Sequence, residues 1–266
     1  MARVRTGFAY LDDVPDGTVL AMAHRGGADH PDLRGLENTR HAFEHAAALG
    51  YRYLETDVHA SSDGVLLAFH DDVLDRVTDV SGELAGMRAT DIAVARIGGA
   101  HAVPTMAELF ESFPEARFNI DLKADAAARP LADLLARTAS EARVCVGSFS
   151  LPRLREFRAL TRGRVATSAA PAEVGAFLLP GAPARALTRG RVAALQVPRR
   201  RGRVPIVTAG LVRRAHAAGA HVHVWTVDDP AEMNELIDLG VDGLITDRTD
   251  LLKDVLVARG QWGDHG

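Results

Sequence analysis

The chain has 266 residues, 47% hydrophobic and 25% charged, an ordinary composition for a soluble globular protein, and its single cysteine excludes an intramolecular disulfide framework. The formal net charge of -4 gives no basic surplus, so we expect no nucleic-acid partner. No run reaches the roughly 18 apolar residues of a membrane-spanning helix, and the sequence shows no signal-peptide pattern. We therefore expect a cytoplasmic protein without stable membrane association. A homo-oligomer is compatible with the sequence.

In chain order, short β-like runs alternate with helical patterns, which predicts a parallel sheet. Eight strands in about 250 residues is the usual size of a closed (β/α)8 barrel, whereas a doubly wound sheet more often has five or six. The expected strands are 19–25, 53–59, 118–123, 143–149, 164–168, 194–197, 221–227 and 243–247, and the expected helices include 39–49, 107–112, 128–142, 151–160, 209–218 and 230–239.

One segment departs from this alternation. Residues 65–70 form a ninth strand-like run after a tight turn at 61–64, which predicts a short hairpin appended to the second strand. Residues 71–104 are irregular and rich in glycine and aspartate, and we expect a small insertion over one barrel mouth. The chain, 1–266, is therefore predicted to be a single TIM-barrel domain.

Polar side chains gather where the predicted strands end, which is the end of a (β/α)8 barrel that carries active sites. Glu55 and Asp57 are two residues apart, so both carboxylates point into the barrel, and Asp121 and Lys123 repeat this spacing on the next strand. Three converging carboxylates would be forced to take up protons unless a cation holds them, and Ca²⁺ or Mg²⁺ prefers such oxygen ligands. Pairing of Glu55 and Asp57 with arginines is the structural alternative.

Two histidines, His24 and His70, lie at the ends of neighbouring strand-like runs. Imidazole titrates near neutrality, so the pair could divide general acid and general base work. Arg25 and Lys123 supply the positive charge that neutralises phosphate oxygens in a transition state. The chain has eleven histidines, so only the company of these cations and carboxylates singles out the pair and indicates a phosphoryl substrate.

The motifs follow one another in a specific order over nearly the whole chain: His24-Arg25-Gly26, Glu37-Asn38-Thr39, Glu55-Thr56-Asp57, Asp63-Gly64, His70-Asp71, Asp121-Leu122-Lys123, Trp225-Thr226-Val227 and Asp242-Gly243-Leu244-Ile245-Thr246-Asp247. This ordered set resembles the glycerophosphodiester phosphodiesterase family, in its bacterial cytosolic form. The resemblance implies a (β/α)8 barrel with a small insertion after the His-Asp motif, where residues 71–104 lie.

The resemblance also implies roles that carry over position by position. They are metal ligands at Glu55, Asp57 and Asp121, a catalytic acid–base pair at His24 and His70, and phosphate contacts at Arg25 and Lys123. One divalent cation is expected, Ca²⁺ or Mg²⁺, with Mn²⁺ as an alternative. Asp121 stands where the family commonly has glutamate, and this shorter side chain could shift the metal.

Two further positions have two interpretations each. Glu37 resembles a residue near the metal and the first histidine, but it could equally support a helix start beside an N-cap at Asn38 or Thr39. Trp225 should lie near the barrel mouth, where an aromatic residue of the family lines the glycerol or alcohol pocket. Core packing is the alternative for Trp225.

The expected reaction is metal-dependent hydrolysis of a small-molecule glycerophosphodiester to glycerol 3-phosphate and an alcohol. The cation would lower the pKa of an attacking hydroxyl or water, His24 would take its proton, and His70 would protonate the departing alkoxide. A cyclic-phosphate route and direct water attack both stay open, as does exchange of the two histidine roles.

Three rival functions are a lysophospholipase D of the same superfamily, a binuclear metal hydrolase and a non-enzymatic binding barrel. The first would need an apolar acceptor for an acyl chain, and the second would want a His-x-His motif at the first strand end. The third would have lost part of the acid–base and metal set. The sequence shows neither an apolar acceptor nor a His-x-His motif at that strand end, and it keeps the complete acid–base and metal set.

Overall fold

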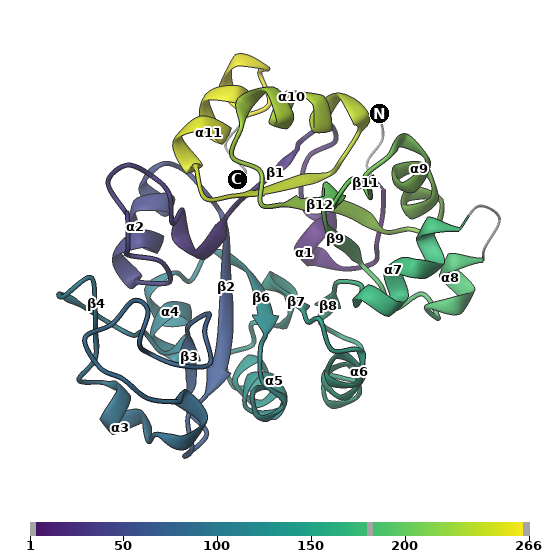
Figure 1. The fold of residues 1–266 in the computed structure, drawn as a ribbon. Coiled ribbons are helices and arrows are strands. Elements are labelled where there is room, and N and C mark those ends of the chain that lie inside the picture. Colours follow the sequence, from purple (N-terminus) through teal and green to yellow (C-terminus); the bar gives the residue numbers. More distant parts are fainter. Residues whose placement is uncertain (1–3, 180–182, 263–266) are drawn as a thin grey trace.

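The barrel predicted from the alternation of strands and helices is confirmed. The computed structural model describes residues 4–179 and 183–262, so both ends of the expected 1–266 domain lie outside the described residues. Eight parallel strands follow one another in the order β8-β7-β6-β2-β1-β13-β12-β9, and Figure 1 shows helices outside this ring. A parallel bridge between Ser168 and Ala194 joins the two ends of the order, which closes the ring.

The eight barrel strands stay within the predicted ranges or exceed them by one residue. They are β1 (Leu20–Ala23), β2 (Tyr53–Ala60), β6 (Arg117–Leu122), β7 (Val144–Gly147), β8 (Ala166–Thr167), β9 (Ala194–Pro198), β12 (His221–Trp225) and β13 (Gly243–Thr246). The helices around them include α2 (Arg40–Ala48), α4 (Met106–Ser112), α5 (Ala128–Arg137), α6 (Leu151–Leu160), α7 (Pro171–Leu178), α8 (Ala184–Leu187), α9 (Ala209–Ala217), α10 (Pro230–Leu239) and α11 (Thr249–Ala258). None of the described helices combines the length and apolar character needed to cross a membrane.

Several predicted boundaries are wrong, and two of them have clear local reasons. The first strand does not continue to residue 25, because β1 ends at Ala23 and the next three residues form a 3-10 turn, η1 (His24–Gly26), in which Arg25 has a φ of 49°. The helix predicted over 128–142 ends at Arg137. There the Thr138 hydroxyl donates to the Leu134 carbonyl and Ala139 adopts a φ of 51°.

Alternation along each strand separates two apolar layers. Leu54 and Val58 of β2 face outward and join the large core between barrel and helices. Tyr53 faces inward, where its ring meets Tyr10 of α1 (Ala9–Asp12) edge to face with centroids 5.2 Å apart. Because α1 plugs the amino end of the barrel with buried apolar side chains, only the carboxyl end is left for a polar site.

The predicted hairpin is present, and its continuation forms a small structure beside the barrel. β3 (Leu66–Ala68) pairs antiparallel with the end of β2. Residues 71–104 contain η2 (Leu84–Gly86), α3 (Ala89–Ile92) and a two-stranded sheet of β4 (Arg96–Ile97) and β5 (His101–Ala102). A separate apolar cluster that includes Leu74 and Leu84 supports this segment. A second two-stranded sheet, β10 (Arg200–Arg201) with β11 (Val204–Pro205), follows β9.

A buried ion pair supports the short strand β8 near the point of closure. Arg158 of α6 lies 2.7 Å from Glu173 of α7, and both side chains are largely shielded from solvent. The same guanidinium donates to the Thr167 hydroxyl at 2.8 Å and to the Ser168 carbonyl at 3.2 Å. Arg158 therefore ties two helices to the two-residue strand.

Candidate active site

The three predicted ligand carboxylates lie on two adjacent strands at the carboxyl end of the barrel. Asp57 of β2 stands directly opposite Asp121 of β6 in the parallel register, and Glu55 precedes Asp57 by two residues. Glu55 and Asp57 are 5% and 2% exposed. The Lys123 ammonium lies 2.9 Å from Asp57 Oδ1 and 2.7 Å from Asp121 Oδ2, between the two carboxylates.

The negative charge of these carboxylates is only partly compensated. Burial raises the pKa of Glu55, and the neighbouring Asp57 adds to this, so that the Glu55 pKa is about 7. Burial would also raise the pKa of Asp57, but Lys123 and Arg25 outweigh it and lower that pKa. The pKa of Asp121 is raised by burial in spite of Lys123. A site with surplus buried carboxylate charge is one that would accept a cation.

His24 is held between two carboxylates by the turn that follows β1. Its Nδ1 lies 2.7 Å from Asp247 Oδ1, just after β13, and its Nε2 lies 3.8 Å from Glu55 Oε2. Burial alone would lower the pKa of His24, but Glu55 and the hydrogen-bonded Asp247 reverse this and raise it to about 9. His24 therefore carries a proton at neutral pH in this structure.

The turn η1 also places Arg25 among the carboxylates. Its backbone N–H donates to Glu55 Oε2 at 3.1 Å, Nη1 donates to Glu37 at 3.1 Å, and Nε lies 3.3 Å from Asp57 Oδ2. The alternative interpretation, in which interior acids pair with an arginine, thus describes one contact of Asp57, whose role as a metal ligand stays a prediction. The next residue must be glycine, because Gly26 has a φ of 87° and a Cβ there would lie 2.6 Å from the Ala42 Cβ of α2.

His70 is oriented by a chain of charged contacts that the sequence did not predict. Its Nδ1 lies 2.6 Å from Asp71 Oδ1, and Arg76 donates to the other oxygen of Asp71 at 2.6 Å. Arg76 also donates to both oxygens of Glu37, at 2.8 and 2.6 Å. Buried His59 lies with its Nε2 3.1 Å from the His70 carbonyl oxygen. Arg76 therefore joins the insertion to the loop that follows η1.

The Glu37-Asn38-Thr39 motif divides its work among three neighbouring residues. Thr39 is the N-cap of α2, since its hydroxyl accepts from the Ala42 amide. Asn38 is 1% exposed with a φ of 58°, accepts from the Thr56 hydroxyl at 2.8 Å and donates to Asp57 at 3.4 Å. The sequence predicted Asn38 only as a possible N-cap, although its position in the Glu37-Asn38-Thr39 motif indicated a place near the site.

An aromatic pair lies at the carboxyl end of the barrel, close to Lys123. Trp225, half-buried at the end of β12, meets Phe149 edge to face with centroids 5.9 Å apart. Phe149 is 64% exposed, and the Lys123 ammonium lies 6.0 Å from its ring centroid. Trp225 also packs on the inner apolar cluster, as its core-packing alternative expects, and its role in lining an alcohol pocket stays a prediction.

The predicted ligand atoms are not gathered as they would be around an ion. Two groups in the described part of the chain have three ligand atoms mutually within 4.8 Å: Asp29 with Asp228 and Asp247, and His30 with Asp32 and His45. Glu55, Asp57 and Asp121 do not form such a group, because Lys123 and Arg25 occupy the positions between and beside them.

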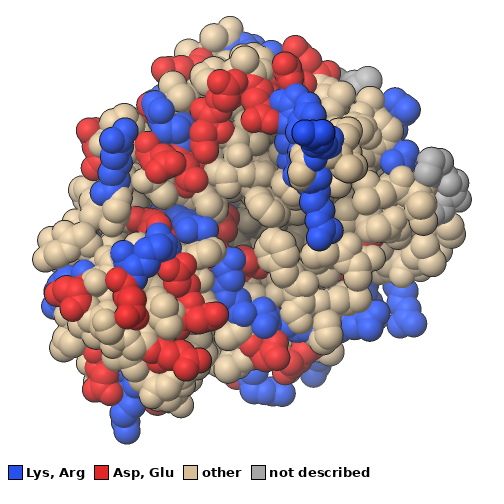
Figure 2. All heavy atoms as spheres, viewed as in Figure 1, with Lys and Arg blue, Asp and Glu red and all other residues tan. Residues whose placement is uncertain are grey.

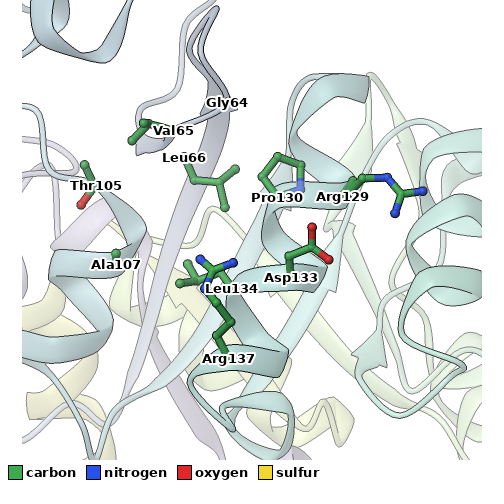
Figure 3. A pocket seen from close by; sticks show the side chains of 10 residues that line it. All are labelled: Gly64, Val65, Leu66, Thr105, Ala107, Arg129, Pro130, Asp133, Leu134 and Arg137. Carbon is green, nitrogen blue, oxygen red and sulfur yellow. The ribbon is translucent and has the colours of Figure 1, made fainter.

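The surface of the protein also carries charged side chains around the mouth of the barrel. Figure 2 shows acidic and basic side chains gathered around a central hollow of the viewed face. A separate pocket of about 420 Å³ lies outside the barrel, with the β2–β3 turn on one side and α5 on the other (Figure 3). Its lining contains none of the predicted site residues, so it does not compete with the mouth as the candidate active site.

Comparisons with known proteins agree with this arrangement. A model of the glycerophosphoryl diester phosphodiesterase family matches residues 24–251, from the first histidine to the start of α11. The chain belongs to that family. It is therefore an enzyme of the phosphoric diester hydrolase class, and its motifs fall within the matched region.

Individual relatives cover nearly the whole chain. A protein of Mycobacterium tuberculosis named "Probable glycerophosphodiester phosphodiesterase 2" is 42% identical over 250 residues, which are 92% of this chain and 94% of the relative. A glycerophosphodiester phosphodiesterase structure from Agrobacterium tumefaciens has a TM-score of 0.73 at 25% identity, covering 88% of this chain and 99% of that one. An Oleispira antarctica phosphodiesterase in complex with the product sn-glycerol-3-phosphate has a TM-score of 0.74 at 21% identity, covering 90% and 97%.

Proposed function

We propose that the chain hydrolyses glycerophosphodiesters to glycerol 3-phosphate and an alcohol, by acid–base catalysis from two histidines at a carboxylate-bound divalent cation. The observation that carries this proposal is the set of opposed charges at the mouth, where Lys123 lies between Asp57 and Asp121. Such a mixture of anions and cations suits a phosphodiester and the cation that accompanies it. On the same fold, the Oleispira protein binds the product that we propose.

The donor chemistry fits a hard divalent cation. Glu55, Asp57 and Asp121 would hold it, and three carboxylates favour Ca²⁺ or Mg²⁺, with Mn²⁺ as an alternative. The raised pKa of Glu55, which burial and Asp57 bring to about 7, supports this fit because it reflects carboxylate charge without a sufficient counter-charge. When bound, the cation supplies Lewis-acid polarisation of the phosphoryl group and of an attacking oxygen.

Two cationic side chains would stabilise the phosphate. Lys123 and Arg25 both lie against Asp57, at 2.9 and 3.3 Å. Their charges would offset the negative charge that grows on the non-bridging oxygens in the transition state. Trp225 and Phe149, the latter close to Lys123, would provide the apolar wall for the glycerol or alcohol group.

The histidines differ in their surroundings, which bears on their roles. Asp71 holds Nδ1 of His70, which leaves Nε2 for proton transfer to the leaving oxygen. His24, whose pKa Glu55 and Asp247 raise to about 9, has the protonation state of an acid in this structure. His24 can serve as the base only when a bound cation offsets the charge of Glu55, so we tie that role to cation binding.

The proposal is tested by the choice of substrate. Purified protein would be given glycerophosphocholine, glycerophosphoethanolamine or lysophosphatidylcholine with Ca²⁺, Mg²⁺ or Mn²⁺, and released glycerol 3-phosphate and lysophosphatidic acid would be measured. We expect glycerol 3-phosphate from the first two substrates and little product from the third. Turnover of lysophosphatidylcholine alone would establish a lysophospholipase D instead, and no turnover of any substrate by folded protein would contradict the proposal.

A further inference from the structure

A second group of ligating side chains lies outside the site described above. His30 and Asp32 belong to the loop between η1 and α2, and His45 lies on α2 itself. Each offers a ligand atom, and the three atoms lie within 4.8 Å of one another. None of these residues has a part in the proposed hydrolysis.

The imidazoles of His30 and His45 lie next to each other with their ring planes tilted by 56°, and their Nδ1 atoms differ in hydrogen bonding. The ring centroids of His30 and His45 are 4.3 Å apart, and the His30 residue is 8% exposed. Nδ1 of His30 accepts the backbone N–H of Asp32 at 3.2 Å, so this nitrogen carries a lone pair and not a proton. Nδ1 of His45 is buried and has no hydrogen-bond partner in the structure. A buried polar atom without a partner is unfavourable, and a cation would satisfy it.

The carboxylate completes the set from the solvent side. Asp32 Oδ2 lies 3.9 Å from His30 Nδ1, and the Asp32 side chain is 77% exposed. Ligands of a tetrahedral zinc ion lie roughly 3.3 Å from one another, since each is about 2.0 to 2.2 Å from the metal. The three ligand atoms lie within 4.8 Å of one another, so an ion would have to draw them closer by up to about 1.5 Å, and the exposed Asp32 side chain is free to rotate toward it.

We propose that His30, Asp32 and His45 form a second cation site, specific for Zn²⁺ and chemically similar ions, with its fourth position open to water. Two imidazoles and one carboxylate select such an ion over Ca²⁺ or Mg²⁺, which prefer oxygen ligands throughout. The site differs in this respect from the all-carboxylate group of Glu55, Asp57 and Asp121.

The position of the site gives binding a structural consequence. The loop that carries His30 and Asp32 continues to Glu37 and Asn38, which contact Arg25 and Asp57 in the candidate active site. An ion held jointly by this loop and α2 would fix the loop to the helix. The three ligands come together only in the folded chain, so the ion would bind the folded state and not the unfolded one. Zn²⁺ should therefore raise the melting temperature of the protein.

The test is direct ion binding, independent of turnover. Metal-stripped full-length protein would be titrated with Zn²⁺ by calorimetry in an excess of Mg²⁺, which occupies oxygen-only sites, and Co²⁺ absorption would report tetrahedral nitrogen and oxygen ligation. We expect one strong Zn²⁺ site in the wild type, weakened at least about tenfold in His45→Ala and in Asp32→Asn. Asp32→Asn guards against misfolding, because its side chain is exposed.

Two matched variants locate the ion. His41→Ala removes a histidine from the same helix, one turn away, and Asp29→Asn removes a carboxylate from the neighbouring acidic group; neither should change Zn²⁺ affinity. The proposal is overturned if Zn²⁺ fails to bind, if His45→Ala and Asp32→Asn bind it as the wild type does, or if the loss follows His41 or Asp29 instead.

Discussion

Asp57 and Asp121 are direct partners in the register of β2 and β6, and the ammonium of Lys123 lies within hydrogen-bonding distance of both carboxylates. The carboxyl ends of parallel strands lie at the same end of the barrel. The pairing of β2 with β6 therefore places the two acids side by side without a contribution from any loop. Loops then add the histidines and arginines around them.

Asp121→Asn should raise the divalent cation concentration needed for half-maximal activity by about tenfold or more, because an anionic oxygen ligand is lost while the side-chain shape stays. The measurement is a cation titration of activity with metal-stripped protein. Asp125→Asn is the matched control, since that side chain is 81% exposed and pairs only with Arg153. An unchanged requirement in Asp121→Asn would remove Asp121 from the ligand set.

Cation affinity should depend on pH through Glu55. Burial and the adjacent Asp57 raise the pKa of Glu55 to about 7, so below that pH a cation must displace a proton before this carboxylate can ligate it. Affinity should therefore rise as pH increases through 7, as calorimetry over a pH series would show. Glu55→Gln should bind more weakly and lose this rise near pH 7, and an unchanged rise in that variant would assign the proton to another group.

His70→Ala should lower kcat by about 10²- to 10⁴-fold while the fold and cation binding are kept, because general acid–base catalysis contributes on that scale. Asp71→Asn should cause a smaller loss, since it weakens the contact at Nδ1 of His70 but leaves the imidazole in place. Steady-state kinetics with circular dichroism would measure both effects. Near-normal turnover of His70→Ala would exclude His70 from proton transfer.

Arg76→Met should lower kcat by about tenfold with a smaller change in KM, because the Arg76 guanidinium is bound to Asp71 and Glu37 and we expect it to act through them. Arg76→Lys should restore only part of the loss, since an ammonium lacks the planar fork that contacts both carboxylates. Arg88→Met is the control from the same insertion, where the arginine is 70% exposed. Equal kinetics for Arg76→Met and wild type would contradict the positioning role.

Glu173→Ala should reduce the free energy of unfolding by about 3 kcal/mol or more, because it leaves the buried guanidinium of Arg158 without its counter-charge beside β8. Urea denaturation would measure the change. Glu141→Ala, which breaks the exposed pair with Arg164, should cost much less. If the two variants lost similar free energy of unfolding, burial of the Arg158–Glu173 pair would not determine how much that pair stabilises the fold.

How much of the site the sequence predicts depends on where each residue lies. Spacing by two along a strand placed Glu55, Asp57, Asp121 and Lys123 on one face, and the structure has them there, because a strand fixes side-chain direction. The role of each remains a prediction. Trp225 was placed near the mouth by the same spacing.

Contacts made by loops carried no comparable signal. Arg76 lies in an irregular insertion and donates a hydrogen bond to Glu37, which is 39 positions away in the sequence. His24 contacts Asp247, which is 223 positions away. No periodicity relates such positions, so only the folded chain shows that Arg76 holds two acids of the site. Likewise, the end of β1 at Ala23 follows from the left-handed backbone of Arg25, which sequence pattern alone did not indicate.

Removal and return of the cation tests whether hydrolysis depends on an ion bound by the carboxylates. Wild-type protein would be stripped with a chelator, and hydrolysis of glycerophosphoethanolamine would be followed by phosphorus NMR before and after addition of Ca²⁺, Mg²⁺ or Mn²⁺. We predict that the stripped protein releases no glycerol 3-phosphate, that at least one of these ions restores release, and that Asp57→Asn with the same ion does not regain it. Full turnover by the stripped protein would contradict the carboxylate-bound cation on which the account rests.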